Sequence, residues 1–290
     1  MKHQYSLAHL SALMLPPLRL IEAAARAGYE FVGLRVNRVT PDEPLYAVTH
    51  DRRLMMQIKA RLADTGVRVL DVELARMGPG EDAGSYVPLL EAAAELGARD
   101  VIAQLPDPDR SRAVERFATL CDLAKPLGIF VNLEFPSWSE TPDLATATRV
   151  LRAVDRPNAA MLIDMLHFGR SGSSCAELAR LPRQWFRYAH VCDAPAAPPA
   201  TRQGLLHAAR CERLFPGEGA LGVREILSCM PPDIPYVLEI PRVSLTRVLG
   251  EDEYVRLALD AARRHLDENR NGVPAPSIGQ EDPGTQAPVT

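Results

Sequence analysis

The amino-acid sequence predicts a single (β/α)8 barrel. Short apolar runs alternate with longer amphipathic segments along most of the chain, and the connections between them are short. Such alternation implies a parallel sheet with helical crossovers. Eight units in roughly 265 residues match the barrel in both number and length. A doubly wound open sheet is the alternative, and it is disfavoured because no GxGxxG follows the first strand.

The predicted strands are the eight apolar runs, rich in Val, Ile, Leu and aromatic residues. In chain order they cover 5–10, 31–36, 67–74, 99–105, 129–134, 159–164, 186–191 and 236–240. Helical periodicity marks the segments 17–28, 52–66, 86–97 and 112–128. Each of these four ends in a glycine that lies within three residues of the next strand, which is typical of a helix C-terminus.

The barrel is expected to occupy residues 1–270. The segment 192–219, which follows the seventh strand, is far longer than an ordinary strand–helix connection and is a candidate active-site cover. Residues 271–290 are rich in Pro, Gly and polar groups, and we expect a disordered C-terminal tail there.

Composition narrows the classes of function. The 290 residues include 33 basic and 37 acidic ones, without a basic cluster of the kind that nucleic-acid binding needs. The five cysteines form no CxxC pair, and there is no N-terminal signal pattern or membrane-length apolar run. These features predict a cytoplasmic protein with a small-molecule substrate, a possible homo-oligomer that binds neither nucleic acid nor membrane.

Polar side chains end the predicted strands. They are His9, Arg35, Glu73, Gln104, Glu134, Asp164, His190 and Glu239. In a barrel the carboxyl ends of the strands converge on one mouth, where enzymes of this fold carry out their chemistry. A polar group at each of these ends therefore predicts a functional site.

The last four of these residues, Glu134, Asp164, His190 and Glu239, stand on consecutive strands. Three carboxylates and one imidazole suit a divalent ion such as Mn²⁺, Mg²⁺, Co²⁺ or Zn²⁺, and an ion also relieves their mutual repulsion. Taken singly, each residue has a simpler interpretation. Asp164 suits a helix N-cap, while Glu134 and Glu239 have possible partners in Arg156 and Arg242.

The sequence resembles the xylose isomerase-like TIM-barrel superfamily, which includes sugar-phosphate isomerase/epimerase-like proteins. The resemblance covers roughly residues 5–267 and rests on an ordered set of motifs. They are "NLE" at 132–134, "IDMLH" at 163–167, "AHVCD" at 189–193, "PGEG" at 216–219 and "LEIPR" at 238–242.

The resemblance implies that Glu134, Asp164, His190 and Glu239 are the metal ligands. It implies that His167 contacts the substrate or the metal's water. It also implies that Asp193 lies behind the ligands or on the lid, the candidate active-site cover at 192–219, and that Glu218 lies near the mouth. Glu140 matches the spacing of a second glutamate in ketose 3-epimerases. Ala196 stands where those enzymes have an arginine, which weighs against epimerisation of a free ketose.

A metal site of this kind polarises a carbonyl group and acidifies the neighbouring C–H bond. With Glu134 and Glu239 as proton carriers, we expect an isomerase or epimerase that acts on a small polyhydroxylated, sugar-like carbonyl compound through an enediolate. The alternative is a dehydratase (lyase) of the 3-dehydroshikimate or keto-inositol type, with His167 as the acid. An endonuclease IV-like repair enzyme and a non-catalytic sugar sensor are weaker alternatives.

Further residues are candidates for substrate contacts. Arg242 suits a carboxylate or phosphate, or else pairs with Glu239. Glu73 binds a substrate hydroxyl or pairs with Arg76. His9 and Trp138 are candidate pocket walls.

Overall fold

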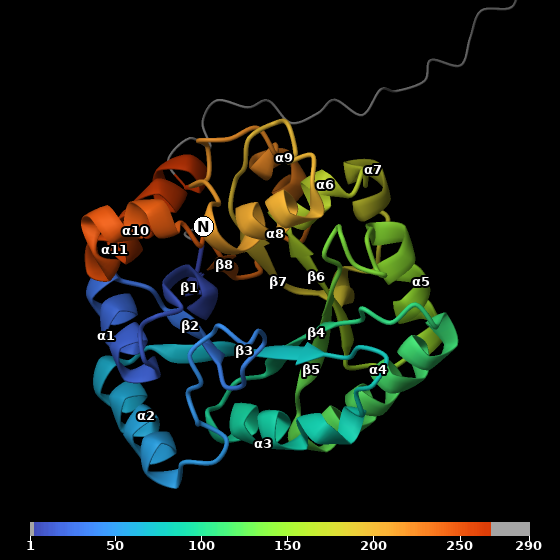
Figure 1. The fold of residues 1–290 in the computed structure, drawn as a ribbon, viewed down its shortest axis with the longest axis horizontal. Coiled ribbons are helices and arrows are strands. Elements are labelled where there is room, and N and C mark those ends of the chain that lie inside the picture. Colours follow the sequence, from blue (N-terminus) through green and yellow to red (C-terminus); the bar gives the residue numbers. More distant parts are fainter. Residues whose placement is uncertain (1–2, 268–290) are drawn as a thin grey trace, which may run out of the picture.

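The chain forms a closed barrel of eight parallel strands surrounded by helices, as the sequence predicted (Figure 1). The computed structural model describes residues 3–267. The strands are β1 (Tyr5–Leu7), β2 (Phe31–Arg35), β3 (Arg68–Arg76), β4 (Asp100–Gln104), β5 (Phe130–Glu134), β6 (Ala159–Asp164), β7 (Phe186–Val191) and β8 (Tyr236–Leu238). β8 closes the barrel on β1, with Tyr5 opposite Tyr236 and Leu7 opposite Leu238. The predicted tail, 271–290, lies outside the described residues.

Helices connect successive strands and cover the outside of the barrel. They are α1 (Pro17–Ala27), α2 (Arg52–Thr65), α3 (Val87–Glu95), α4 (Arg110–Ala124), α5 (Leu144–Val154), α6 (Met165–Arg170), α7 (Cys175–Leu178), α8 (Arg202–Cys211), α9 (Val223–Ser228), α10 (Val243–Leu249) and α11 (Glu251–Leu266). Short 3-10 turns are η1 (His9–Ala12), η2 (Ala83–Tyr86), η3 (Lys125–Leu127) and η4 (Arg183–Trp185). Among the described residues, no helix combines the length and apolar character that a membrane crossing requires.

Local chemistry explains where the elements begin and end. Gly28 and Gly66 close α1 and α2 in the left-handed region, as the sequence predicted. α4 begins at Arg110, two residues earlier than predicted, because the Asp109 carboxylate accepts a hydrogen bond from the Arg112 amide. The first strand ends at Leu7, before the predicted boundary, because the chain turns into η1.

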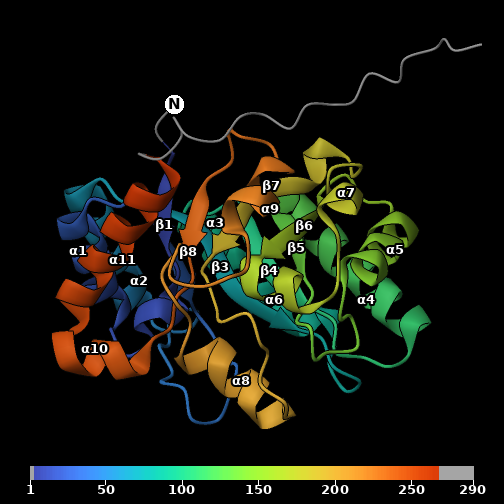
Figure 2. The same ribbon diagram turned by 90° about the horizontal axis from the view of Figure 1, so that it is seen from above.

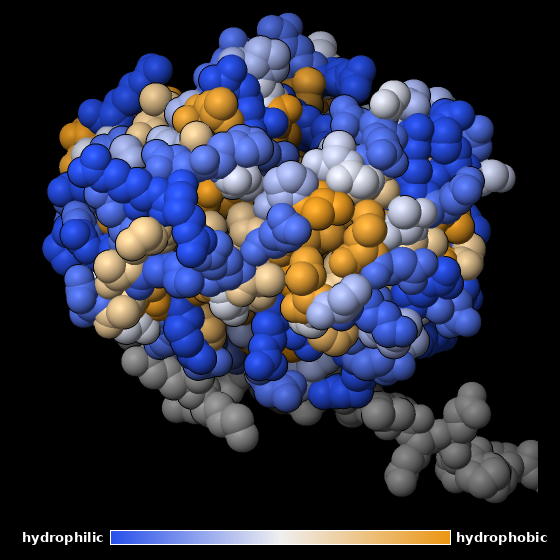
Figure 3. Space-filling model, turned by 90° about the horizontal axis from the view of Figure 1, so that it is seen from below, coloured by the Kyte–Doolittle hydropathy of each residue, from blue (hydrophilic) through white to orange (hydrophobic). Residues whose placement is uncertain are grey.

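Apolar side chains fill the space between the strands and the helices, and a small apolar layer lies inside the barrel. That inner layer consists of Ala8, Leu74, Ile102, Leu162, Tyr188 and Val237. The outer surface on the side of α2 and α3 is mostly polar, with a group of apolar residues near its centre (Figure 3). The barrel interior also holds buried polar groups, among them Asp71. Burial, and then the nearby Glu73, raises the pKa of Asp71 above its usual range.

The segment after β7 carries α8 over the mouth of the barrel, where Figure 2 shows it standing out from the body. The base of this segment is fixed by an antiparallel bridge between Asp193 and Leu214. The buried Asp193 carboxylate accepts hydrogen bonds from the amides of Ala194, Gly217 and Leu221, at 2.9 to 3.1 Å. Asp193 thus ties the two ends of the segment together.

Gly219 packs against Asp193 and Ala194, at the base of the segment that carries α8. A Cβ atom at this position would stand 2.3 Å from the Ala194 carbonyl oxygen and 2.4 Å from Asp193 Oδ1, which is too close for any side chain. Only glycine therefore fits at position 219, where the segment that carries α8 returns to the barrel.

We expect Gly219→Ala to lower the free energy of unfolding by about 1–3 kcal/mol, because the added methyl group must push backbone aside. Gly78→Ala is the matched control, since a Cβ there meets nothing within 4 Å. Urea unfolding of both variants measures the difference. Equal free energies of unfolding for the two variants would contradict the close packing at Gly219.

Candidate metal centre and active-site mouth

Four strand ends bring Glu134, Asp164, His190 and Glu239 together at the mouth, with one ligand atom of each within 4.8 Å of all the others. Glu134 and Asp164 are the last residues of β5 and β6, and Glu239 directly follows β8. His190, near the end of β7, stands opposite Asp164 in the sheet register. All four are buried. The structure therefore gathers the four residues that the sequence grouped as a ligand set.

His190 Nδ1 lies at the centre of the carboxylates. It is 3.4 Å from Glu239 Oε2, 3.6 Å from Asp164 Oδ2 and 3.7 Å from Glu134 Oε1. Within residues 3–267, Nδ1 makes no hydrogen bond. Ligand atoms that each stand about 2.0–2.2 Å from a shared ion lie roughly 3–4 Å apart. The spacing and the oxygen–nitrogen donor set therefore fit a divalent ion.

Asp164 has two roles, one for each oxygen. Oδ1 accepts hydrogen bonds from the backbone amides of Leu166 (2.8 Å) and His167 (3.2 Å), which caps α6. Oδ2 faces His190. The helix-cap and ligand interpretations are therefore compatible, and the cap holds the carboxylate in a fixed orientation.

A buried arginine that sequence reasoning missed completes the centre. Arg213, 2% exposed, places Nη1 2.7 Å from Asp164 Oδ2 and Nη2 2.7 Å from Glu239 Oε2. Its Nε donates to the Ala209 carbonyl at 2.7 Å. The segment 192–219 has no periodicity that singles out Arg213. Its position three residues before "PGEG" was the one feature of the sequence that could have pointed to it.

The charges of the centre are strongly coupled. Burial opposes ionisation of Asp164, but Arg213 outweighs it and holds the pKa of Asp164 well below its usual range. Burial likewise opposes ionisation of Glu239, and His190 and Arg213 lower its pKa overall. Burial disfavours the His190 imidazolium, yet Glu239 and the other carboxylates raise its pKa well above the usual value. Burial, together with Glu239 and Asp164, raises the pKa of Glu134 to about 7.

Gln104 links this centre to a second arginine. Its amide nitrogen donates to Glu134 Oε2, and its amide oxygen accepts a 3.0 Å hydrogen bond from Arg76 Nε. Gln104 was among the predicted strand-end residues but was given no role in the site. The structure places it between a candidate ligand and a cation of the pocket wall.

His167 and Trp138 form one wall of the pocket, packed edge to face with ring centroids 4.8 Å apart. Burial lowers the pKa of His167 to about 4, so the imidazole is neutral near pH 7. It can exchange hydrogen bonds with a ligand but is poorly suited to donate a proton to a leaving hydroxyl group.

Two candidate contacts on early strands have structural partners instead. His9 lies in η1, where Nε2 pairs with the Leu15 carbonyl and Nδ1 accepts from the Arg35 amide, both at 2.9 Å. Glu73 pairs with Arg35 at 2.7 Å rather than with Arg76. Neither residue lines the pocket.

Four later candidates also lie away from the pocket lining. Asp193 holds the α8 segment through backbone amides. Glu218 pairs with Arg242 at 2.7 Å, and that guanidinium stacks over Phe215. Glu140 is exposed. Motif spacing identified the region of each residue but not the direction of its side chain.

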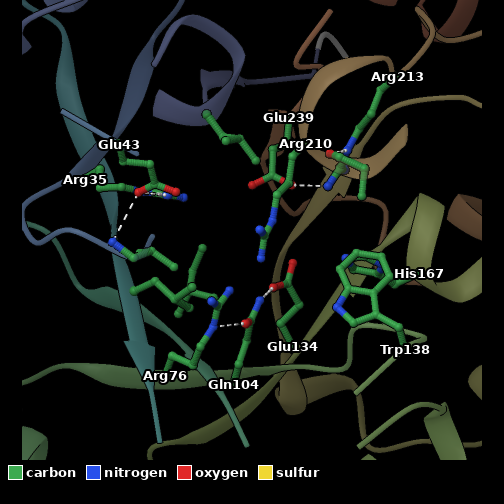
Figure 4. Close-up of a pocket in the computed structure, with 15 residues that line it drawn as sticks. Arg35, Glu43, Arg76, Gln104, Glu134, Trp138, His167, Arg210, Arg213 and Glu239 are labelled. Carbon is green, nitrogen blue, oxygen red and sulfur yellow. Dashed lines mark hydrogen bonds and ion pairs between the residues drawn. The ribbon is translucent and has the colours of Figure 1, made fainter. Parts of the chain in front are cut away.

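The pocket above the centre is a hollow of about 520 Å³, counting its open side (Figure 4). Polar residues dominate its lining: Arg35, Glu43, Arg76, Gln104, Glu134, His167, Arg210, Arg213 and Glu239. Leu10, Val39, Leu74, Ile102, Trp138 and Ala209 provide the remaining surface. A lining of this polarity suits a small, highly oxygenated molecule.

Arg213→Met should lower the free energy of unfolding of the metal-free protein by about 3–5 kcal/mol, because it leaves two buried carboxylates without their cation. Arg242→Met is the control, since its half-exposed pair with Glu218 is worth less than about 1 kcal/mol. Urea unfolding in the presence of a chelator gives both values. A loss below about 1 kcal/mol in Arg213→Met would rule out the proposed charge balance.

Known proteins resemble this chain in sequence and in fold. An inosose isomerase of Bacillus licheniformis is 26% identical over 190 residues, a match that spans 62% of this chain and just under two thirds (64%) of the relative. An inosose isomerase of Halalkalibacterium halodurans is 28% identical over 38% of each chain.

Among solved structures, the IolI protein with a bound zinc atom superimposes with a TM-score of 0.75. It is 19% identical, and the match covers 91% of this chain and 99% of that one. D-psicose 3-epimerase of Clostridium cellulolyticum H10, solved with D-tagatose, has a TM-score of 0.69 at 16% identity, with the same coverage. At these identities the two structures show the shared fold. The family description "Xylose isomerase-like TIM barrel" matches residues 21–265, and the chain therefore belongs to that family.

Proposed function

We propose that this protein is a divalent-metal-dependent isomerase or epimerase that acts on a small polyhydroxylated carbonyl compound. The observation that carries the proposal is the arrangement of Glu134, Asp164 and Glu239 around His190 Nδ1, at distances suited to a shared ion. The inosose isomerase relatives and the D-psicose 3-epimerase neighbour support the reaction class.

In this proposal Glu134, Asp164, His190 and Glu239 hold the ion, and its identity is one of Mn²⁺, Mg²⁺, Co²⁺ or Zn²⁺. The zinc bound by the IolI protein supports a divalent metal. When bound, such an ion supplies Lewis acidity that draws electrons from a carbonyl oxygen and acidifies the adjacent C–H bond.

In this proposal, the carboxylates of the centre transfer the proton of the acidified C–H bond. Glu134 and Glu239 belong to β5 and the end of β8, so they approach the pocket from different parts of the barrel wall. One carboxylate takes the proton from the carbon next to the carbonyl, and the C–H electrons form the C=C bond of an enediolate. Return of a proton to the opposite face by the other carboxylate gives epimerisation. Return to the neighbouring carbon, with transfer of the adjacent hydroxyl proton to the former carbonyl oxygen, gives isomerisation.

His167 favours this reaction over dehydration. Loss of a β-hydroxyl group requires a proton donor, and burial keeps the pKa of His167 at about 4. A neutral imidazole instead orients substrate hydroxyl groups by hydrogen bonding. The dehydratase alternative therefore lacks its expected acid.

The reaction class is tested by proton exchange in deuterated water. Protein loaded with Mn²⁺ is incubated with inososes and ketoses, and NMR follows exchange of the C–H proton and the appearance of an epimer or isomer. We expect Glu134→Gln and Glu239→Gln to abolish exchange and to reduce bound metal, while Glu140→Gln retains both. Exchange that persists in both Gln variants at full rate would overturn the assignment.

Metal affinity should rise with pH through the range 6–8. The protonated forms of Glu134 and His190 cannot bind a metal, and both pKa values are raised above their usual values in the metal-free protein. Below the Glu134 pKa of about 7, each pH unit should weaken binding at least about tenfold. Competition titration with a chromogenic chelator measures the effect. A dissociation constant that is flat from pH 6 to pH 8 would contradict it.

A further inference from the structure

Four arginines reach the pocket, but carboxylates neutralise only two of them. Arg213 pairs with Asp164 and Glu239. Arg35 is held by Glu43 at 2.8 Å and by Glu73 at 2.7 Å. The other two, Arg76 and Arg210, make no ion pair with any residue between 3 and 267.

Arg76 is half-buried at the end of β3. Among the described residues, the one hydrogen bond that its side chain donates goes to an uncharged group, the Gln104 amide oxygen. This bond uses Nε, so the two terminal nitrogens remain available to a ligand. Burial, then the positive charges of Arg210 and Arg35, lower the pKa of Arg76. A guanidinium in such surroundings gains from a nearby anion.

Arg210 comes from the opposite direction, near the end of α8 over the mouth. Figure 4 shows its side chain extending from the lid into the pocket, on the side of Gln104 and Glu134. Within the described part of the chain this guanidinium has no hydrogen-bond partner. Two guanidinium groups thus face one hollow from the barrel wall and from the lid.

The carboxylates of the metal centre do not account for these two cations. A divalent ion together with Arg213 balances the formal charges of Glu134, Asp164 and Glu239. Around Arg35, the two carboxylates leave one formal negative charge. The two positive charges of Arg76 and Arg210 exceed this negative charge by one. The metal-loaded pocket therefore keeps one net positive charge for its ligand.

We propose that Arg76 and Arg210 bind an anionic group of the substrate, a carboxylate or a phosphate monoester. The inference rests on the proposed function and narrows its substrate to an acidic or phosphorylated polyhydroxy carbonyl compound. Arginine is well suited to this task because its planar donor fork matches both groups. Because Arg210 belongs to α8, the anion also ties the lid to the barrel wall.

The chain of contacts from Arg76 through Gln104 to Glu134 sets the order of the substrate's groups. The carbonyl end lies at the metal ligands, and the anionic end lies one side chain farther out. A substrate with a short carbon chain between the two ends fits this order. Leu74 and Ile102 also line the pocket, and their apolar side chains suit that carbon chain.

The proposal is tested by calorimetric titration of the Mn²⁺-loaded protein with three probes of one carbon skeleton. D-erythrose is neutral, D-erythruronate keeps the aldehyde and carries a carboxylate at C4, and D-erythrose 4-phosphate carries a phosphate at the same end. We expect at least one anionic probe to bind about tenfold or more tightly than D-erythrose, since hydrogen bonds to charged groups are the strong ones. The probe with the larger preference identifies the type of anion.

Arg76→Gln and Arg210→Gln should each remove most of that preference, because each replaces a guanidinium proposed to hold the anion with an uncharged amide. Arg202→Gln is the matched control, because Arg202 is exposed at the start of the same helix. Metal content and circular dichroism confirm that each variant is folded and loaded. Raised salt should weaken the anionic probes alone.

Two results would overturn the proposal. One is equal binding of all three probes by the unaltered protein. The other is an anion preference that survives in both arginine variants, which would place the anion on the metal. Proton exchange in deuterated water is read separately, so a failed anion test with active exchange rejects only the anion site. Arginine-dependent anion binding without exchange rejects only the reaction.

Discussion

The neutralisation of three buried carboxylates at one end of the barrel is the constraint on which the site depends. Parallel strands β5, β6 and β8 deliver Glu134, Asp164 and Glu239 to the same small volume, where their charges repel. His190 stands among them, and Arg213 pairs with two of them at 2.7 Å. In the proposed function a dication would complete the balance, and metal binding would then be coupled to the protonation of these groups and to the stability of the mouth.

The segment after β7 is organised around the same need. Asp193 and Gly219 fix its base, and only a glycine allows the backbone to pass so close to the Ala194 carbonyl. The fixed base positions Arg213 behind the carboxylates and Arg210 above the pocket. One loop thus supplies both the cation that holds the centre and the cation proposed to recognise the substrate, so a disturbed loop should affect metal binding and ligand binding together.

The pocket has two zones that differ in charge, the candidate metal centre and the region around Arg76 and Arg210. At the centre, Arg213 pairs with Asp164 and Glu239 at 2.7 Å. One side chain farther out, Arg76 and Arg210 have no carboxylate partner among residues 3–267. Between the two zones, Gln104 contacts both Arg76 and Glu134, so one amide connects the outer part of the pocket with a candidate metal ligand.

The sequence by itself determined the barrel, the approximate strands and the convergence of the four candidate ligands, because strand periodicity and the shared direction of parallel strands fix which residues meet at one edge. Tertiary structure decided the rest. Asp193, Glu218 and His9 carry the right chemistry, but their partners turned them away from the pocket. Arg213 and Arg210 lie in a segment without strand periodicity, so no pattern predicts the direction of their side chains. Only the packing of that segment on the barrel brings them to the carboxylates and the pocket.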